Sequence, residues 1–418
     1  MSTKEQILDA AETEIETVGS SDFRIQRVAA AAGVTAPLIY RHFDSREALI
    51  DTAVLNRAER LSRVLLDAVI CNIDAANREE DFDVALSVVF GEVYGATSEA
   101  SDTLRWAIAK ALVIAWSHPE LPTLALDNVR EIYRRTASFF SDRLGQKGIV
   151  EPETIAYVFL TRWFGGIIVD EAYGRSSELS TSPELEVAFV NAVRDGPHVF
   201  PLPDPTPFSL DIPAPTLLDQ GARTTKGKII DAAIEELAAV GSVAATVKGI
   251  AMRAGIDPPL IYRHFSSRSD LLAIAGVIAN ERLFSGRLQA IKPIFTPVAT
   301  MGELLGRNAA IVGPDVGGIS EFVRRSGVSS LVAARHYPEA METAKRTALA
   351  FSERHATWIR SLQDASIIGD HFSATHIAVF LLCMTYGASL CDGDPVMSIS
   401  ADQFEAIFVV FWRDALGA

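Results

Sequence analysis

The chain has 418 residues, of which 49% are hydrophobic and 22% are charged, and its formal net charge is −15. This length suits two to four domains, and the composition excludes an intrinsically disordered chain. The acidic balance argues against a uniformly basic surface for nucleic acid, although the positions of the basic residues decide that question.

Signals for secretion, membranes and metals are missing from the sequence. The N-terminal segment carries acidic residues and lacks the apolar stretch of a secretory signal, which predicts a cytoplasmic protein. The longest stretch without an ionisable group other than Cys or Tyr, Ile377–Cys391, has 15 residues. It is shorter than the roughly 20 residues needed to cross a bilayer, so we expect a buried helix and no membrane contact. The three cysteines, Cys71, Cys383 and Cys391, lack metal-ligand spacing, so we expect no disulfide, metal or cofactor.

Apolar residues near the N-terminus follow a helical rhythm. They recur at intervals of three and four from Ile7 to Val18, which predicts an amphipathic helix that ends at Gly19. Thr3 and Gln6 have the spacing of a capping box at its start.

Three further helices are predicted directly after this one. The second covers about residues 25–32 and stops at the following glycine. The third is very short, begins with Thr35 as its N-cap and has Pro37 in its first turn, where a missing N–H costs little. The fourth begins at Asp44, which has capping-box spacing with Glu47. Two short helices joined by a glycine turn and braced by a longer one indicate a helix-turn-helix.

The same pattern returns in the second half of the chain. Tyr40–Phe43 and Tyr262–Phe265 both read YRHF, and residues 7–49 paired without gaps to residues 229–271 give 21 identities in 43 positions. The glycine, N-cap and capping-box signals recur at Gly241, Gly255, Asp257, Pro258, Pro259, Ser267 and Asp270. Gly165 with Gly387 and Asp170 with Asp392 keep the same offset in numbering, so both halves are predicted to share one fold.

Helical patterns also fill the rest of each half, and residues 196–224 separate the halves. Further helices are predicted at about residues 81–97, 103–117, 126–145, 154–173 and 183–194 of the first half, and at 374–391 and 401–415 of the second. Residues 196–224 contain seven of the chain's 19 prolines and therefore predict a semi-extended linker. We expect an all-α fold that is a tandem duplication, with two heads at 1–50 and 225–272 and two helical bodies at 51–195 and 273–418.

Each copy carries one motif of high specificity. AGVTAPLIYRHFDSREAL, residues 32–49, and AGIDPPLIYRHFSSRSDL, residues 254–271, resemble the signature of the TetR family of bacterial transcription regulators. The resemblance implies that the short third helix of each head enters the major groove. The candidate DNA-contacting residues of copy one are Arg24, Thr35, Ala36, Pro37, Tyr40, Arg41, His42 and Arg46. Those of copy two are Thr246, Lys248, Asp257, Pro258, Pro259, Tyr262, Arg263, His264 and Arg268.

The resemblance also implies roles for some of these residues. Tyr40, His42 and their counterparts donate to phosphates, and Arg46 and Arg268 neutralise phosphates, which sets register rather than sequence. The alternatives are a packing role for the tyrosine, a packed or capping histidine, and arginines that are only solvated. Leu38, Ile39, Phe43 and Leu49 are expected to be core residues.

The two heads differ in charge and in their reading residues. Residues 1–60 hold seven Lys/Arg and ten Asp/Glu, whereas residues 222–282 hold eight and six, so copy two suits DNA better. Copy two has Thr246 where the family places Thr or Ser, and copy one has Arg24 there. Because the groove-facing residues differ, the two heads should read an asymmetric, imperfect palindrome.

The bodies are expected to pair and to bind an effector. The resemblance implies that the last two helices of each copy form a four-helix interface, within one chain here, with further homodimerisation possible. A stripe of Phe404, Ile407, Phe408 and Phe411 suits either this interface or the core of its own copy. A small-molecule effector is expected in the bodies, where the candidate pocket residues are Trp106, Trp116, Phe139, Trp163, Phe322, Trp358, Phe380 and Tyr386; each suits a plain core position as well.

The sequence therefore predicts a ligand-responsive repressor that binds double-stranded DNA as a single-chain pseudo-dimer. An enzyme is disfavoured, because GPDVGG at residues 313–318 lacks the lysine of a P-loop and no nucleophile or metalloprotease motif occurs. The alternative is a small-molecule-binding or protein-docking module in which one head, copy one by its charge, has lost DNA binding.

Overall fold

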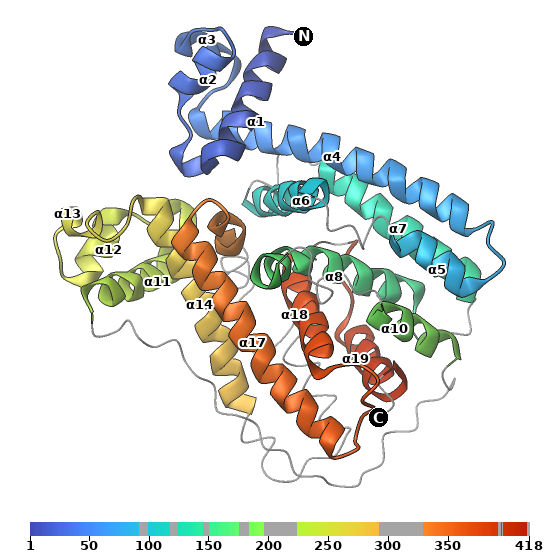
Figure 1. Ribbon diagram of the computed structural model, residues 1–418. Helices are drawn as coiled ribbons and strands as arrows, with labels where there is room; N and C mark the ends of the chain where they lie inside the picture. The colour runs from blue at the N-terminus through green and yellow to red at the C-terminus, as the bar shows by residue number, and fades with distance from the viewer. Residues whose placement is uncertain are drawn as a thin grey trace.

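A computed structural model describes residues 1–91, 99–117, 124–144, 150–174, 184–195, 224–291, 329–391, 394 and 396–415. Every regular element in these ranges is a helix (Figure 1), which confirms the all-α class. The predicted linker, except Thr224, and the candidate pocket residue Phe322 lie outside the described residues.

Copy one forms a head and a body that share one long helix. Its helices are α1 (Thr3–Asp22), α2 (Ile25–Ala31), α3 (Ala36–His42), α4 (Arg46–Ala76), α5 (Phe82–Gly91), α6 (Glu99–Ser117), α7 (Leu124–Leu144), α8 (Pro152–Tyr173) and α10 (Glu184–Asp195). α4 begins in the head and continues into the body, where it packs along α5, α6 and α7 (Figure 1). The head is therefore attached to the body through a continuous helix.

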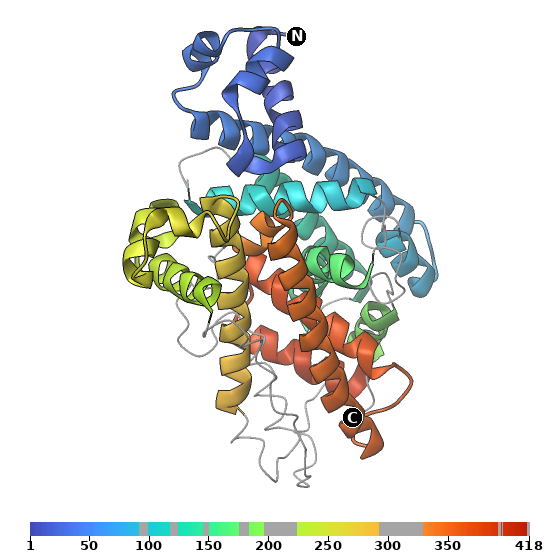
Figure 2. The same cartoon turned by 60° about the vertical axis from the view of Figure 1, so that its left-hand side comes forward.

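Within the described residues, copy two repeats the head helices and the last helices of this order. They are α11 (Thr225–Ala244), α12 (Val247–Ala254), α13 (Pro258–Ile261), α14 (Arg268–Ile291), α17 (Pro338–Asp364), α18 (Ala374–Cys391), α19 (Ala401–Val409) and a π-helix (Val410–Ala415). A short helical segment at residues 329–334 precedes α17. Figures 1 and 2 show the first head at the top of the molecule and the second at its left side, with the two bodies packed together below the first head and to the right of the second.

The helix termini correct two details of the sequence prediction. Ser2 and Glu5, rather than Thr3 and Gln6, form the capping box of α1. At the start of α4, Ser45 Oγ accepts the Ala48 N–H at 3.0 Å, so the predicted Asp44–Glu47 capping box is wrong. In both cases the serine one residue away has extended backbone angles and a hydroxyl that reaches the third residue of the helix.

The first helix of each head also extends beyond its predicted end. α1 passes through a left-handed break at Gly19 (φ 75°) and ends at Asp22, and α11 continues through Gly241 to Ala244. At Gly19 a Cβ would lie 2.7 Å from Cγ of His336, so a side chain there would collide with copy two. Gly19 therefore allows the end of α1 to approach the other copy.

The two bodies meet where α8 crosses α18. Almost every residue of α8 from Thr154 to Asp170 is buried, because the helix has its own body on one side and α18 on the other. A Cβ on Gly165 would overlap the carbonyl oxygen of Cys383, and a Cβ on Gly387 would overlap that of Thr161. The two glycines occupy equivalent positions of the repeat, and so do the two carbonyls, so the crossing is symmetric between the copies.

The C-terminal stripe contributes to both packing arrangements that the sequence allowed. The Phe404 ring makes an edge contact with Tyr157 of copy one, with centroids 6.4 Å apart. Phe411 stacks on Phe380 of its own copy at 4.8 Å. Ile407 is buried, and the side chain of Phe408 lies outside the described set. α18 is long and apolar enough to cross a membrane, but 83% of it is buried in the protein.

Candidate nucleic-acid interface

The first head is a small hydrophobic core that carries an exposed helix. Ile39 and Phe43 on one side of α3 are buried with Leu49, as predicted, and Leu38 is half-buried. Gly33 joins α2 to α3 at φ 66°, a left-handed conformation that favours glycine. This turn positions α3 with its opposite side facing away from the core.

The candidate reading residues of copy one lie on that outer side. Thr35, Pro37, Tyr40, Arg41 and His42 are exposed, and Ala36 is half-buried. The Tyr40 side chain is 52% exposed, so it does not serve as a packing residue. The Arg41 side chain has no ion-pair partner among the described residues.

Copy two presents the corresponding surface on α12, α13 and the turn that follows α13. Lys248, Asp257, Pro258, Pro259, Tyr262 and Arg263 are exposed, and His264 is half-buried. Tyr262 is 56% exposed, close to the value for Tyr40. Gly255 repeats the left-handed turn at φ 66°. The two heads therefore expose the same tyrosine and arginine, and they differ at the two positions before the shared proline, Thr35-Ala36 in copy one and Asp257-Pro258 in copy two.

The start of the second helix differs between the heads in the way the sequence indicated. Thr246 Oγ1 accepts the Gly249 N–H at 3.0 Å and caps α12. Arg24 occupies the N-cap of α2 with no side-chain cap and is exposed. In copy one the first N–H groups of α2 therefore have no side-chain cap and lie beside Arg24. Free helix N–H groups and an arginine both attract a phosphate.

Arg46 and Arg268 both make a structural contact inside their heads. Arg46 Nε donates to the Phe23 carbonyl at 3.3 Å, and Arg268 Nε donates to the Ala245 carbonyl at 2.7 Å. The two carbonyls, like the two arginines, occupy equivalent positions of the repeat. Each arginine therefore joins the start of the fourth helix to the residue just before the N-cap of the second. A phosphate contact by either one stays a prediction.

Several acidic residues of copy one are paired away from its reading helix, whereas Asp44 and Glu47 are exposed just after it. α2 and α3 contain no Asp or Glu. Glu12 is buried on Arg60, Glu14 pairs with Arg27 at 2.6 Å, and Glu16 pairs with Arg57. The net charge of this head as a whole therefore underestimates how well α3 suits a polyanion.

A comparison with known families identifies these heads. The sequence model described as bacterial regulatory proteins of the tetR family matches residues 7–53 and again residues 229–274. The chain belongs to the TetR family, in two tandem copies. It is therefore a helix-turn-helix DNA-binding transcription regulator. A comparison with curated proteins found no match to the chain.

The aromatic residues expected in effector pockets of this TetR protein are packed into the bodies. Phe139 packs against Phe140 at 5.4 Å, Trp163 against Phe164 at 5.1 Å, and Trp358 against Trp412 at 5.4 Å. Phe380 stacks on Phe411, and Tyr386 is buried with its pKa raised by burial. Trp106 lines a cavity of about 30 Å³ beneath Arg335. The side chain of Trp116 lies outside the described residues.

One group of residues was not found from the sequence. Lys110 of α6 and His336 of copy two face each other beside a larger cavity between the copies. Neither residue belongs to the signature. A comparison of Lys110 with Val332, its counterpart in the repeat, would have shown a charge that only one copy carries.

Proposed function

We propose that the protein is a ligand-responsive repressor that binds an asymmetric, pseudo-palindromic operator as a single-chain pseudo-dimer in the cytoplasm. TetR-family regulators are in general not enzymes, and the proposal assigns no catalysis. Two heads, at residues 1–50 and 225–272, would each place one recognition helix in a major groove, and the remaining residues of each copy would form the bodies.

The exposed residues of α3, of α13 and of the turn after α13 are the observation that carries the DNA-binding part of this proposal. Tyr40, Arg41, Tyr262 and Arg263 extend from equivalent positions of two like heads, and no described residue covers them. Arginine and tyrosine at these positions can contact phosphates and base edges. The differing neighbours, Thr35-Ala36-Pro37 against Asp257-Pro258-Pro259, favour two unlike half-sites.

The α8–α18 crossing supports a single-chain arrangement. In a symmetric dimer the same helix of each subunit meets its partner in the same way. Here α8 and α18 meet at Gly165 and Gly387, and two contacts at the edges of the bodies reinforce the pairing. Arg130 Nη2 donates to Asp394 of copy two at 2.8 Å, and Tyr173 bonds to Ser352.

The alternative is a protein in which only the head of copy two binds DNA. The charge of residues 1–60 favours this alternative, whereas the acid-free surface of α2 and α3 favours two working heads.

Operator binding by Arg41→Ala and Arg263→Ala variants tests the proposal and distinguishes the alternative. These arginines are exposed and outside both head cores, unlike Arg46 and Arg268, whose removal would also disturb the fold. With a duplex selected from a random pool, each variant should bind about 1–3 kcal/mol more weakly by fluorescence anisotropy. If R41A binds as tightly as wild type while R263A does not, only copy two contacts DNA; if neither variant changes affinity, the proposed interface is wrong.

A further inference from the structure

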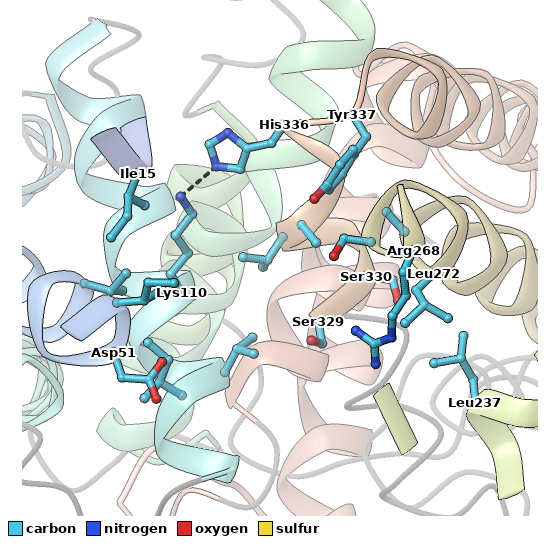
Figure 3. Close-up of a pocket in the computed structure, with 18 residues that line it drawn as sticks. Ile15, Asp51, Lys110, Leu237, Arg268, Leu272, Ser329, Ser330, His336 and Tyr337 are labelled. Carbon is cyan, nitrogen blue, oxygen red and sulfur yellow. Dashed lines mark hydrogen bonds between the residues drawn. The ribbon is translucent and has the colours of Figure 1, made fainter. Parts of the chain in front are cut away.

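A cavity of about 260 Å³ lies between the two copies, where their heads join their bodies. One wall comes from α1, α4 and α6 of copy one, and the other from α11, α14 and the segment 329–337 of copy two (Figure 3). A molecule in this cavity would touch both heads at once. It would not lie inside either helical body.

Equivalent positions of the two copies line the cavity from opposite sides. Ile15 faces the cavity from copy one and Leu237, its counterpart in the repeat, from copy two. Ile50 and Leu272 form a second such pair. The cavity therefore lies on the pseudo-twofold axis that relates the two copies, and both copies contribute equally to its apolar lining.

The polar lining does not follow this symmetry. Lys110 of copy one corresponds to Val332, and Asp51 corresponds to Ala273. In a dimer of identical chains a lysine at this position would occur twice, and the two ammonium groups would face each other across the axis. The fused chain can present one lysine to the cavity, which suits a single charged group.

Lys110 is a partly buried cation whose partner is a neutral group. Its Nζ donates to Nε2 of His336 at 2.9 Å (Figure 3), and it makes no ion pair with a carboxylate in the part of the chain that the structure describes. Burial, with Arg335 nearby, lowers the pKa of Lys110 to about 8. Burial and the charge of Lys110 lower the pKa of His336 to about 3, so the imidazole is neutral and accepts the hydrogen bond.

The opposite wall adds hydrogen-bond donors. Ser269, Ser330 and the Tyr337 hydroxyl line it, together with the guanidinium of Arg268. Asp51 is the one acidic residue of the described lining, and the Lys110 side chain extends away from it toward His336 (Figure 3). The lining thus carries two cations and one anion, which leaves room for one further negative charge.

We infer that this cavity binds a small amphipathic monocarboxylate, whose carboxylate is held by Lys110 and whose apolar part lies among Ile15, Ile50 and Leu272. The carboxylate accepts a charge-assisted hydrogen bond from the Lys110 ammonium. Its binding supplies the negative charge that the buried lysine lacks. Because residues of both heads line the site, a bound monocarboxylate favours one distance between α3 and α13. The consequence for DNA binding rests on the proposed function, whereas the binding of the carboxylate does not.

A titration without DNA tests the site directly. The full chain with ¹³C-labelled isoleucine δ1 methyl groups is titrated with hexanoate, and with hexan-1-ol and hexylamine as neutral and cationic analogues. Ile15 and Ile50 line the cavity, so their methyl signals report binding there. Hexanoate should shift these signals saturably and at lower concentration than either analogue.

Two lysine variants complete the test. Lys110→Met keeps the length of the side chain and should weaken hexanoate binding at least tenfold, while Lys345→Met, at an ion pair with Glu171 elsewhere between the copies, should leave it unchanged. The inference is overturned if hexan-1-ol binds as well as hexanoate, if K110M binds hexanoate like wild type, or if the Ile15 and Ile50 signals do not move. The effect of hexanoate on operator affinity is measured in a separate experiment. A protein that does not bind DNA can therefore be distinguished from a cavity that does not bind hexanoate.

Discussion

Gly165→Ala places a methyl group where α8 touches the backbone of α18. The new Cβ would overlap the Cys383 carbonyl, and because that oxygen belongs to the backbone of a buried helix it cannot rotate away. Overpacking a core costs about 1–3 kcal/mol, and this site belongs at the upper end. The better helix propensity of alanine returns about 1 kcal/mol, so the free energy of unfolding should fall by about 2 kcal/mol.

Urea denaturation followed by circular dichroism measures this loss. The control is Gly166→Ala in the same helix, where the closest atom to the Cβ would be Nη1 at the end of the Arg105 side chain, 2.8 Å away, and the other neighbours are at ordinary contact distance, so we expect a change within about 1 kcal/mol. Gly387→Ala should cost as much as Gly165→Ala, since it meets the Thr161 carbonyl in the equivalent way. The double variant should cost less than the sum, because helices that have already separated accommodate the second methyl group. A Gly165→Ala protein as stable as wild type, or no less stable than Gly166→Ala, would refute this packing.

Three further predictions concern the heads and the cavity. Thr246→Ala removes the cap on Gly249 and should lower the free energy of unfolding by about 1 kcal/mol, whereas Arg24→Thr adds a cap to α2 and should raise it; urea midpoints that move in the opposite directions would contradict this. Tyr40→Phe and Tyr262→Phe remove exposed hydroxyls, so stability should stay within about 0.5 kcal/mol while operator binding weakens by about 1 kcal/mol, and equal anisotropy curves would argue against phosphate contacts. Lys110, which faces His336, Arg335, Arg57 and Glu16, has a pKa lowered to about 8 in the folded state from 10.5, so between these pH values the unfolded state binds more protons and stability should rise with pH. Lys110→Met should lack that part of the rise, and identical pH profiles for the two proteins would count against the buried ammonium.

The heads could be predicted from the sequence because their signals are local. Apolar spacing, a left-handed glycine and an N-cap residue all act within one or two turns, so α1 to α3 and α11 to α13 were expected close to where they lie. The two capping boxes of copy one were misplaced by one residue, since adjacent residues such as Ser2 and Thr3 both suit the N-cap, whereas the predicted Ser267 of copy two does accept the Asp270 N–H. Only the backbone angles distinguish them.

The contacts between the copies could not be predicted in the same way. The repeat shows that Gly165 and Gly387 are equivalent positions. It does not show that both lie where α8 crosses α18. The hydrogen bond between Lys110 and His336 joins residues from different copies, and no local pattern relates them. Likewise, the sequence could not choose between the two packing roles of the C-terminal stripe, because Phe404 takes one and Phe411 the other.

The stoichiometry of the operator complex tests the central claim most directly. Native mass spectrometry of the full chain with a selected duplex counts the chains bound to one duplex. A single-chain pseudo-dimer predicts one chain per duplex, and an Arg41→Ala/Arg263→Ala double variant serves as the control without specific binding. Two chains on every duplex, with no one-chain complex at any protein concentration, would contradict the claim that the paired copies of one polypeptide form the DNA-binding unit.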